Sequence, residues 1–520
     1  MLLLHLLFIS KASIVSPETI TEEKQKGFKH IVTTTPDTGG NGFISAPFLI
    51  RSTWLLLAYF GVRMIFLALN VASFVPPDEV THAGLCKIFS QVVLLPENSP
   101  ATYEFGLVTN TAWLYYWIMG KLLYLNVFGI SDLIYLRLFN IPLAFGTIFF
   151  VRRTLLLLTH DRLADLLLLV AMTNTAMFTF LSASVSYDNL VNLLAAMAIY
   201  YLLAFFTNRS GTMLAAAILC QLAGSLTKVT FLPLVLALNL LLLMHEFRRV
   251  AIFPATLKTY FLTSGFKERL LALMIVIALA FNLHLYAGNY LHFETLTPSM
   301  SDVFPANIAT QYRIVARETV FREYSEGRIS YMDALVMTGE IKHPGDKADT
   351  FYLLMNYENL KRNPRLWMGP LSYAKVWFEQ MMSTTFGIKG HLPMYKNARD
   401  LIPIYLMVSL SLFGFFLRWR PRDSGWLPPC LGAIALFYAG FLMYKINYSA
   451  YLYYGTPGIT LQGRYLFPVI GPVYILACYY LLNLFRADYI RYSLALATAL
   501  VFISYDFPWF LMHATPEWYR

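Results

Sequence analysis

Charged side chains are scarce in this sequence. Asp, Glu, Lys and Arg together make up 13% of the 520 residues, whereas a soluble domain carries about 25%. This scarcity, with 57% hydrophobic residues and a mean hydropathy of +0.54, excludes a soluble globular enzyme. Apolar runs of about 20 residues recur along the chain, and each is long enough to cross a hydrocarbon core about 30 Å thick. The sequence therefore predicts an all-α polytopic membrane protein built as one helical bundle.

Cysteine pairs and basic stripes are also missing. The four cysteines show no CxxC spacing, so neither a disulfide framework nor a zinc site is indicated. The 40 Lys and Arg residues exceed the 30 Asp and Glu residues, but they are scattered between apolar runs and form no stripe that would bind nucleic acid. We interpret this excess as the positive charge of cytoplasmic turns. No internal repeat is visible, which argues against the repeat-built transporter folds.

About eleven transmembrane helices are expected, in a range of roughly 9 to 13, from the apolar runs and the placement of Lys and Arg. The expected spans are residues 52–74, 133–151, 164–183, 190–206, 212–226, 229–245, 270–288, 401–417, 426–443, 465–485 and 492–511. The expected domains are a poorly ordered cytoplasmic leader (1–50), an N-terminal transmembrane module (51–288), an extracytoplasmic helical domain (289–399) and a C-terminal transmembrane module (400–520). The first outer loop, residues 75–132, is expected to carry an interfacial helix over 111–127.

Ionisable residues from distant parts of the chain are expected together at the outer level of the membrane. They are Asp78, Glu79, His82, Arg137, Asp188, Lys228 and Arg464. Ionisable groups at membrane depth usually face the interior of a bundle or a cavity, so these side chains are expected to share one outer cavity. Arg63 lies near the middle of the first span and should pair inside the bundle, with Asp188 as one candidate partner.

The motif PPDEVTH, which follows the first span, admits two interpretations. In the first, a carboxylate of Asp78 or Glu79 is a general base that deprotonates an acceptor hydroxyl, with His82 one helical turn further on. In the second, Asp78 caps a helix, Glu79 favours the positive end of that helix, and His82 is solvated. The motif by itself leaves both interpretations open.

Arg464 stands in the motif QGRYLFP at the outer start of a late span, followed by Tyr465. A guanidinium there either binds a phosphate through two parallel hydrogen bonds or anchors the span by reaching the lipid headgroups. Asp188, in SVSYDNL, and Lys228, in SLTKVTF, are single charges at outer turns. They either end helices or line the expected cavity.

Four motifs in this order resemble a known family. They are PPDEVTH after the first span, SYDN two spans later, FGIKGH before the late spans and QGRYLFP near the end. Together they are similar to a family of predicted bacterial membrane proteins of unknown function, which resembles the GT-C superfamily of integral-membrane glycosyltransferases. The resemblance covers roughly residues 50 to 510. It implies a GT-C-like fold, an acidic catalytic residue in the first outer loop, and a sugar donor carried on a polyprenyl phosphate.

By this resemblance Asp78, or failing it Glu79, is the catalytic base, and Arg464, Lys228 and Arg137 hold the phosphate. The expected substrate-binding residues are Arg464, Lys228, Arg137, His82, Asp188 and Tyr465. The acceptor is then an extracytoplasmic glycan, lipid or protein, and the active site faces outward from a bacterial inner (plasma) membrane. No cofactor is indicated with certainty, and a divalent cation held by Asp78, Glu79 and Asp188 stays open, since carboxylates suit hard cations. The sugar, the anomeric outcome and the oligomeric state also stay open.

Two rival functions fit the same composition. A transporter or flippase of lipid-linked sugars also needs outer cations and a groove for the lipid tail. It would need an inner-facing counterpart site, however, and Arg63 is the one intramembrane charge noted beyond the outer groups. A non-catalytic subunit of a glycan-assembly complex would use its acids only as helix caps, so that changing Asp78 would cost no activity.

Overall fold

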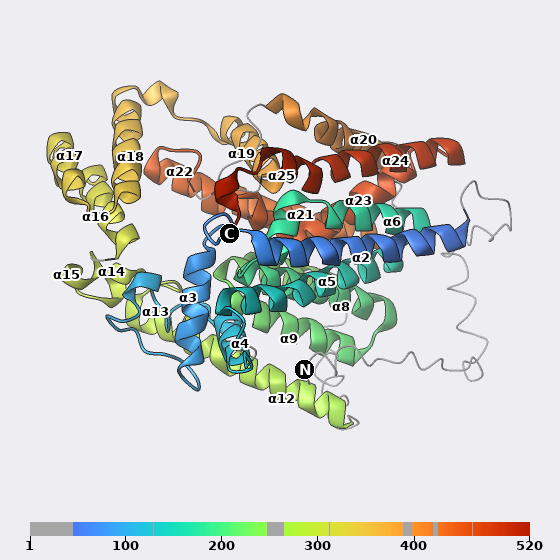
Figure 1. The fold of residues 1–520 in the computed structure, drawn as a ribbon, viewed down its shortest axis with the longest axis horizontal. Helices are drawn as coiled ribbons and strands as arrows, with labels where there is room; N and C mark the ends of the chain where they lie inside the picture. The colour runs from blue at the N-terminus through green and yellow to red at the C-terminus, as the bar shows by residue number, and fades with distance from the viewer. Residues whose placement is uncertain are drawn as a thin grey trace.

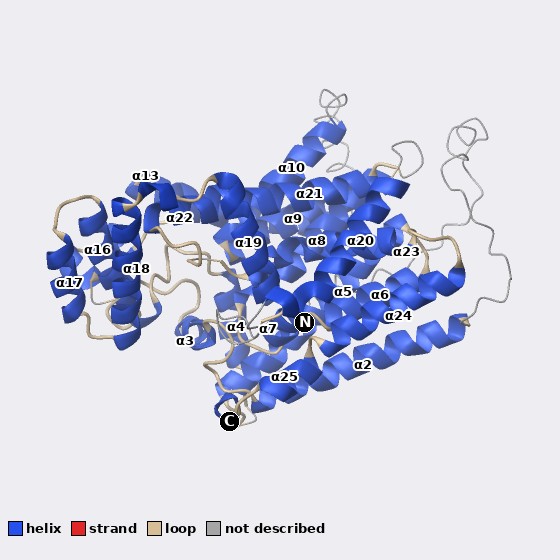
Figure 2. Cartoon of the chain, turned by 90° about the horizontal axis from the view of Figure 1, so that it is seen from above, coloured by secondary structure: helices blue, strands red, loops and turns tan. Residues whose placement is uncertain are grey.

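The computed structural model describes residues 45–127, 129–246, 265–310, 312–387, 398–419, 425–459 and 461–520. Within these residues the chain is helical, and its one β contact is an isolated bridge between Val71 and Tyr519 (Figure 2). The all-α class predicted from the sequence is confirmed. Residues 1–44 of the expected leader, and residues 388–397 with most of the FGIKGH motif, lie outside the described residues.

Long helices run through most of the molecule (Figure 1). In the described ranges, nine helical stretches are long and apolar enough to cross a membrane, and a tenth counts if a bent pair is one span. The nine comprise α2 (Ala46–Asn70), α5 (Asp132–Leu158), α8 (Tyr187–Asn208), the 3₁₀ turn Val229–Phe231 with α10 (Leu232–Glu246), α12 (Phe266–Asn282) with α13 (Gly288–Phe293), the end of the 3₁₀ turn Ala398–Leu401 with α20 (Ile402–Arg418), α21 (Leu427–Gly440) with α22 (Ser449–Tyr454), α23 (Ile470–Leu482) with the 3₁₀ turn Gly463–Val469, and α24 (Asp488–Ser504) with α25 (Phe507–His513). The bent pair is α6 (Arg162–Thr173) and α7 (Ala176–Ser182), and α9 (Gly211–Thr227) is a shorter apolar helix. The chain is therefore a multi-pass membrane protein.

Two expected spans differ from the helices that the structure contains. The span expected at 164–183 is the pair α6 and α7, which is bent by 69°. At the break, the side chains of Asn174 and Thr175 donate hydrogen bonds of 2.9 and 2.8 Å to carbonyls four residues earlier, and such bonds compete with the helical ladder. The span expected at 212–226 is α9, whose 17 residues rise only about 26 Å at about 1.5 Å per residue.

The first helix also begins earlier than expected. Helix α2 starts at Ala46, inside the range 1–50 that was assigned to the leader. Pro47 occupies the first turn of this helix, where a proline is well tolerated because its missing N–H would have no helical partner. The apolar residues that follow it extend the span.

Helix α8 lies at the centre of the bundle, where it packs against α5 and α9. In the most apolar part of α8, 72% of the residues are buried. The corresponding share is 28% in α2 and 11% in the stretch that contains α12. A helix that is apolar on all sides is buried in protein or faces lipid. Helix α2 belongs to the second kind, because Trp54, Leu55 and Val62 are exposed on it. The start of α8, which carries the SYDN motif, is therefore held inside the bundle.

Helices α3 (Glu79–Ser90) and α4 (Leu114–Leu123) lie at one end of the bundle, which we call the α3 end (Figure 1). Helix α4 lies where the interfacial helix was expected. A helical lobe lies beyond this end, and it contains α14 (Met300–Val303), α15 (Ala306–Ala309), α16 (Arg313–Ser325), α17 (Tyr331–Glu340) and α18 (Pro344–Arg362). Helix α19 (Pro370–Thr385) leads back to the bundle. The described residues between Phe293 and Arg399 contain no candidate span.

Candidate active site

Asp78 lies in the turn between α2 and α3, directly after Pro76 and Pro77. Its φ of 59° and ψ of 13° are left-handed, a conformation that few non-glycine residues adopt and that Asp and Asn tolerate best. The residue occupies the N-cap position of α3, but its side chain makes no capping hydrogen bond. The carboxylate instead accepts a hydrogen bond of 2.6 Å from Arg464 Nη2. The capping interpretation of Asp78 is therefore wrong.

Arg464 reaches the first loop because two segments approach each other closely. An added Cβ on Gly463 would collide with the backbone of Thr385 in α19, so only glycine permits this approach. The Gly463 amide donates a hydrogen bond of 2.7 Å to Thr384 Oγ1. Arg464 is 2% exposed, and its Nη1 lies 3.5 Å from the Pro77 carbonyl. The QGRY motif is thereby joined to the PPDE motif.

Asp188 and Lys228 form a second ion pair beside the first. Lys228 Nζ donates a hydrogen bond of 2.6 Å to Asp188 Oδ1, and Arg464 Nη1 lies 3.6 Å from Asp188 Oδ2. Lys228 Nζ also lies 4.4 Å from the ring centre of Tyr187 and 4.6 Å from that of Tyr465, within the range of cation–π attraction. Lys228 is thus fixed between a carboxylate and two aromatic rings.

Asp78, Arg464, Asp188 and Lys228 together make what we call the ion cluster. Its two acids and two bases balance formally. The side chains of Arg464, Asp188 and Lys228 are at most 8% exposed, whereas that of Asp78 is 44% exposed. Asp78 is therefore the member that a ligand reaches first. Moving its carboxylate away from Arg464 leaves the other three side chains with a net positive charge.

His82 lies on α3 beside the ion cluster. Its Nδ1 is 2.9 Å from the Tyr116 hydroxyl, and its ring packs edge-on against Tyr187 with 4.5 Å between the ring centres. The pKa of His82 is lowered to about 4, chiefly by burial. The cations Arg464 and Lys228 add to this lowering, and the carboxylates of Asp78 and Asp188 oppose it. The imidazole is therefore neutral. In the part of the chain that the structure describes, its buried Nε2 has no hydrogen-bond partner.

Glu79 and Arg137 form a separate, buried pair. Arg137 Nε and the Val185 amide both donate to Glu79 Oε1 at 2.8 Å, and Arg137 Nη2 donates to Glu79 Oε2. Arg137 Nη1 donates to the carbonyls of Ala68 and Val71 at 3.0 and 2.7 Å. Burial raises the pKa of Glu79 even though Arg137 lies beside it. The polar side-chain atoms of both residues are thus engaged by protein groups that lie outside the ion cluster.

Two residues of the site were not singled out from the sequence, Tyr116 and Tyr187. Tyr187 stands inside the SYDN motif, next to Asp188, so the motif itself was a signal for it. Tyr116 stands in the aromatic-rich helix α4, and only its contact with His82 distinguishes it from its aromatic neighbours. The Tyr116 hydroxyl fixes the His82 ring through Nδ1, and the Tyr187 ring packs against both His82 and Lys228.

The partner expected for Arg63 is wrong. Arg63 Nη1 pairs with Asp506, and its Nη2 donates a hydrogen bond of 2.7 Å to the Thr173 carbonyl. Thr173 is the last residue of α6, and the carbonyls at the end of a helix lack helical partners. Asp188, the candidate partner, is instead engaged by Lys228.

No metal-binding group is formed by the described residues. In these residues no group of three or more His, Cys, Asp or Glu side chains is placed to hold a metal ion. Each carboxylate considered for a divalent cation faces a basic partner: Asp78 pairs with Arg464, Glu79 with Arg137 and Asp188 with Lys228. A cation at this site would have to displace those partners.

No protein-family model and no curated protein matches the chain. Among solved structures, it is similar to the crystal structure of ArnT from Cupriavidus metallidurans in the apo state, with a TM-score of 0.35 and 12% sequence identity. The match covers 82% of this chain and 76% of that chain. This similarity assigns no role to any side chain of the present protein.

Proposed function

We propose that this protein is a membrane glycosyltransferase of the GT-C type, which moves a sugar from a polyprenyl-phosphate donor to an extracytoplasmic acceptor. The observation that carries the proposal is the ion pair between Asp78 and Arg464. It joins the acid of the first loop to the arginine of the last motif, beside Lys228 and Asp188. A candidate base and two candidate phosphate-binding cations therefore occupy one small site.

In this proposal the donor phosphate exchanges with the Asp78 carboxylate on Arg464. A phosphate, like a carboxylate, accepts parallel hydrogen bonds from the planar guanidinium, so it can take the place of Asp78 on Arg464. Lys228, which already lies close to Arg464 through their shared partner Asp188, supplies the second positive charge. The exchange releases Asp78, so donor binding itself frees the base.

The chemical step then uses both halves of the ion cluster. Asp78 accepts the proton of the acceptor hydroxyl, whose oxygen forms a bond to the anomeric carbon of the sugar. The bond between that carbon and the phosphate oxygen breaks, and the polyprenyl phosphate leaves with the electron pair. Arg464 and Lys228 stabilise the charge that develops on the leaving phosphate. Asp78 fits the role of base better than Glu79, because Glu79 is buried and bound by Arg137.

The neutral imidazole of His82 fits the same scheme as a hydrogen-bonding group. A protonated histidine would repel the two cations of the cluster, and its low pKa excludes that form at neutral pH. Its Nε2 is available to a polar group of the sugar or of the acceptor. Tyr116 and Tyr187 keep the ring in position.

The test is a transfer assay with the full chain in proteoliposomes. Polyprenyl-phosphate sugars are presented one at a time, and the loss of sugar from the lipid is measured with wild type and with Asp78→Asn. Asp132→Asn is the matched control, because Asp132 is an exposed acid at the α3 end that lies outside the ion cluster. We expect sugar loss with wild type and with the control, and a large decrease with Asp78→Asn.

Two results would contradict the proposal. A transporter would change the side of the membrane on which the donor is found while leaving the donor intact. A non-catalytic subunit would cleave no donor, and Asp78→Asn would behave as wild type.

A further inference from the structure

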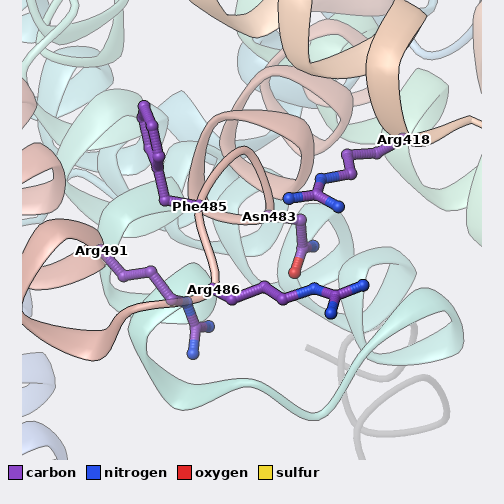
Figure 3. A pocket seen from close by; sticks show the side chains of 5 residues that line it. All are labelled: Arg418, Asn483, Phe485, Arg486 and Arg491. Carbon is purple, nitrogen blue, oxygen red and sulfur yellow. The ribbon is translucent and has the colours of Figure 1, made fainter.

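An open cavity of about 290 Å³ lies where α20 and α23 end and α24 begins, at the end of the bundle opposite to α3 (Figure 1). It is lined by Arg418, Asn483, Phe485, Arg486 and Arg491 (Figure 3). These residues come from the end of α20, the turn after α23 and the first turn of α24. All three helices belong to candidate spans, so the cavity lies at the depth at which those spans leave the hydrocarbon.

The three arginines of this cavity are engaged to different extents. Arg491 is paired with two carboxylates, at 2.5 Å from Asp161 and 3.3 Å from Asp488. Arg418 donates a hydrogen bond of 3.0 Å to the Leu484 carbonyl, which carries no charge. Arg486 is exposed. No described acidic residue lies within ion-pair distance of Arg418 or Arg486, so within the described part of the chain these two positive charges have no acidic partner.

These two charges face the same space. In Figure 3 the guanidinium groups of Arg418 and Arg486 both extend toward the space beside Asn483, while that of Arg491 points elsewhere. Both side chains line the same cavity. Like charges repel each other, and an anion placed between them relieves the repulsion. A guanidinium is shaped for bidentate binding of phosphate. The excess of Lys and Arg at cytoplasmic turns accounts for the presence of arginines, but it does not account for their convergence on one hollow.

The surroundings of the cavity favour a ligand that belongs to the membrane. Phe485, in its wall, is 42% exposed, and Phe416 and Leu417, beside Arg418 on α20, are 77% and 53% exposed. Exposed apolar side chains at this depth contact acyl chains. The cavity is also slightly smaller than the roughly 300–1,000 Å³ typical of sites that enclose a whole small molecule. It therefore fits a headgroup whose tails lie outside it.

We infer that this cavity binds the phosphate of an anionic membrane lipid, between Arg418 and Arg486. The acyl chains lie along the exposed apolar surface of α20 beside Phe485. The inference does not rest on the proposed glycosyltransferase activity, since the cavity lies at the other end of the bundle. It assigns a second phosphate site to the protein, one that is occupied by lipid and takes no part in sugar transfer.

The experiment measures thermal unfolding of the full chain in neutral detergent. Phosphatidylglycerol is compared with phosphatidylcholine of the same acyl chains and with inorganic phosphate at the same phosphate concentration. A ligand that binds only the folded state raises the unfolding temperature in proportion to its occupancy. We expect phosphatidylglycerol to raise it, and the other two to have little effect. In the double variant Arg418→Gln/Arg486→Gln, the concentration of phosphatidylglycerol that gives half of the maximal increase in unfolding temperature should be at least about tenfold higher than in wild type.

The matched control is Arg162→Gln, which removes an exposed positive charge at the same end of the bundle, outside the cavity. It should respond to phosphatidylglycerol as wild type does. If the double variant gives no folded protein, Arg486→Gln alone should show the same shift to a smaller degree, because the exposed Arg486 side chain contributes little to packing. Equal effects of phosphatidylglycerol on wild type and variant would overturn the inference. The inference would also be overturned if phosphatidylcholine or inorganic phosphate raised the unfolding temperature as much as phosphatidylglycerol does. The same holds if Arg162→Gln weakened the response to phosphatidylglycerol as much as the double variant does.

Discussion

Arg464 and Asp78, which are 386 residues apart in the chain, form an ion pair with 2.6 Å between Nη2 and Oδ2. One partner is buried and the other is 44% exposed. The buried guanidinium is fixed by the packing of Gly463 against α19, whereas the carboxylate sits on a turn with one face toward solvent. A ligand therefore moves Asp78 more easily than Arg464, and substitutions of the two residues should have different effects.

Asp78→Asn should abolish most of the transfer activity without loss of folded protein. The amide keeps the size of the side chain and can still hydrogen-bond to Arg464, but it has no carboxylate to accept a proton. Turnover should decrease by about 10²- to 10⁴-fold, the typical contribution of a general base. The measurement is sugar transfer per mole of folded protein. Near-normal turnover would exclude Asp78 as the base.

Arg464→Lys should separate phosphate binding from a simple role as a membrane anchor. Lysine keeps the charge and reaches headgroups equally well, but it lacks the planar arrangement of donors. A phosphate-binding role predicts a loss of about 1.5–3 kcal/mol, or about 10- to 100-fold in kcat/KM for the lipid-phosphate donor.

The control for this prediction is Arg209→Lys, because Arg209 is paired with Glu246 and lies outside the ion cluster. The unfolding temperatures of both variants should stay near that of wild type. If Arg464→Lys is as active as wild type, Lys228 must hold the phosphate instead, since Arg137 is engaged by Glu79 outside the ion cluster.

Arg137→Met should destabilise the protein strongly, because it leaves the buried Glu79 carboxylate without its partner. Removing one member of a buried ion pair costs about 3–5 kcal/mol. The double variant Glu79→Leu/Arg137→Met should recover part of this loss, since neither charge remains to be buried. The measurements are the yield of protein extracted in detergent and its unfolding temperature. Single variants that stay stable but lose activity would instead place Glu79 or Arg137 in the chemistry.

The buried His82 should make stability depend on pH. The pKa of His82 is about 4 in the folded state and 6.5 in the unfolded chain. Between these two pH values the unfolded chain therefore binds more protons than the folded protein. The contribution of the neutral His82 to the free energy of unfolding is therefore fully present above about pH 6.5. It is lost as the pH decreases toward 4, by about 3 kcal/mol in total. The groups that face the imidazole and enter this balance are Asp78, Asp188, Arg464, Lys228, Tyr116 and Tyr187.

His82→Gln removes this proton-binding group and should flatten the dependence. The unfolding temperatures of wild type and variant are compared at pH 7.5 and pH 5. The decrease between the two pH values should be smaller in the variant, and equal decreases would show that His82 does not titrate in this range. Carboxylates that titrate in the same range contribute equally to both proteins and cancel in the comparison.

Most of the helices could be predicted from the sequence, and the reason is physical. In a hydrocarbon layer each backbone polar group must be satisfied within its own segment, so a long apolar run has almost no alternative to a helix. The exceptions are local. The break between α6 and α7 depends on the side chains of Asn174 and Thr175 bonding to backbone carbonyls, and hydropathy does not detect such bonds.

The candidate residues could also be found, since ionisable groups are costly at membrane depth and seldom stay there without a role. The sequence by itself thus determined the all-α membrane class and a short set of charged residues, among them Asp78, Glu79 and Arg464. What it left open was how these charges pair. Asp78 and Glu79 are neighbours in the chain, and nothing in the motif PPDEVTH distinguishes them.

Only the tertiary structure decided the pairing. The left-handed turn at Asp78 directs that residue to Arg464, while Glu79 begins α3 and meets Arg137 of α5. Arg63 pairs with Asp506, 443 residues away in the sequence. In an environment of low polarity a charge must be compensated by a group within hydrogen-bond distance. Which group that is depends on which helices become neighbours, and the packing of side chains from the whole chain determines that arrangement.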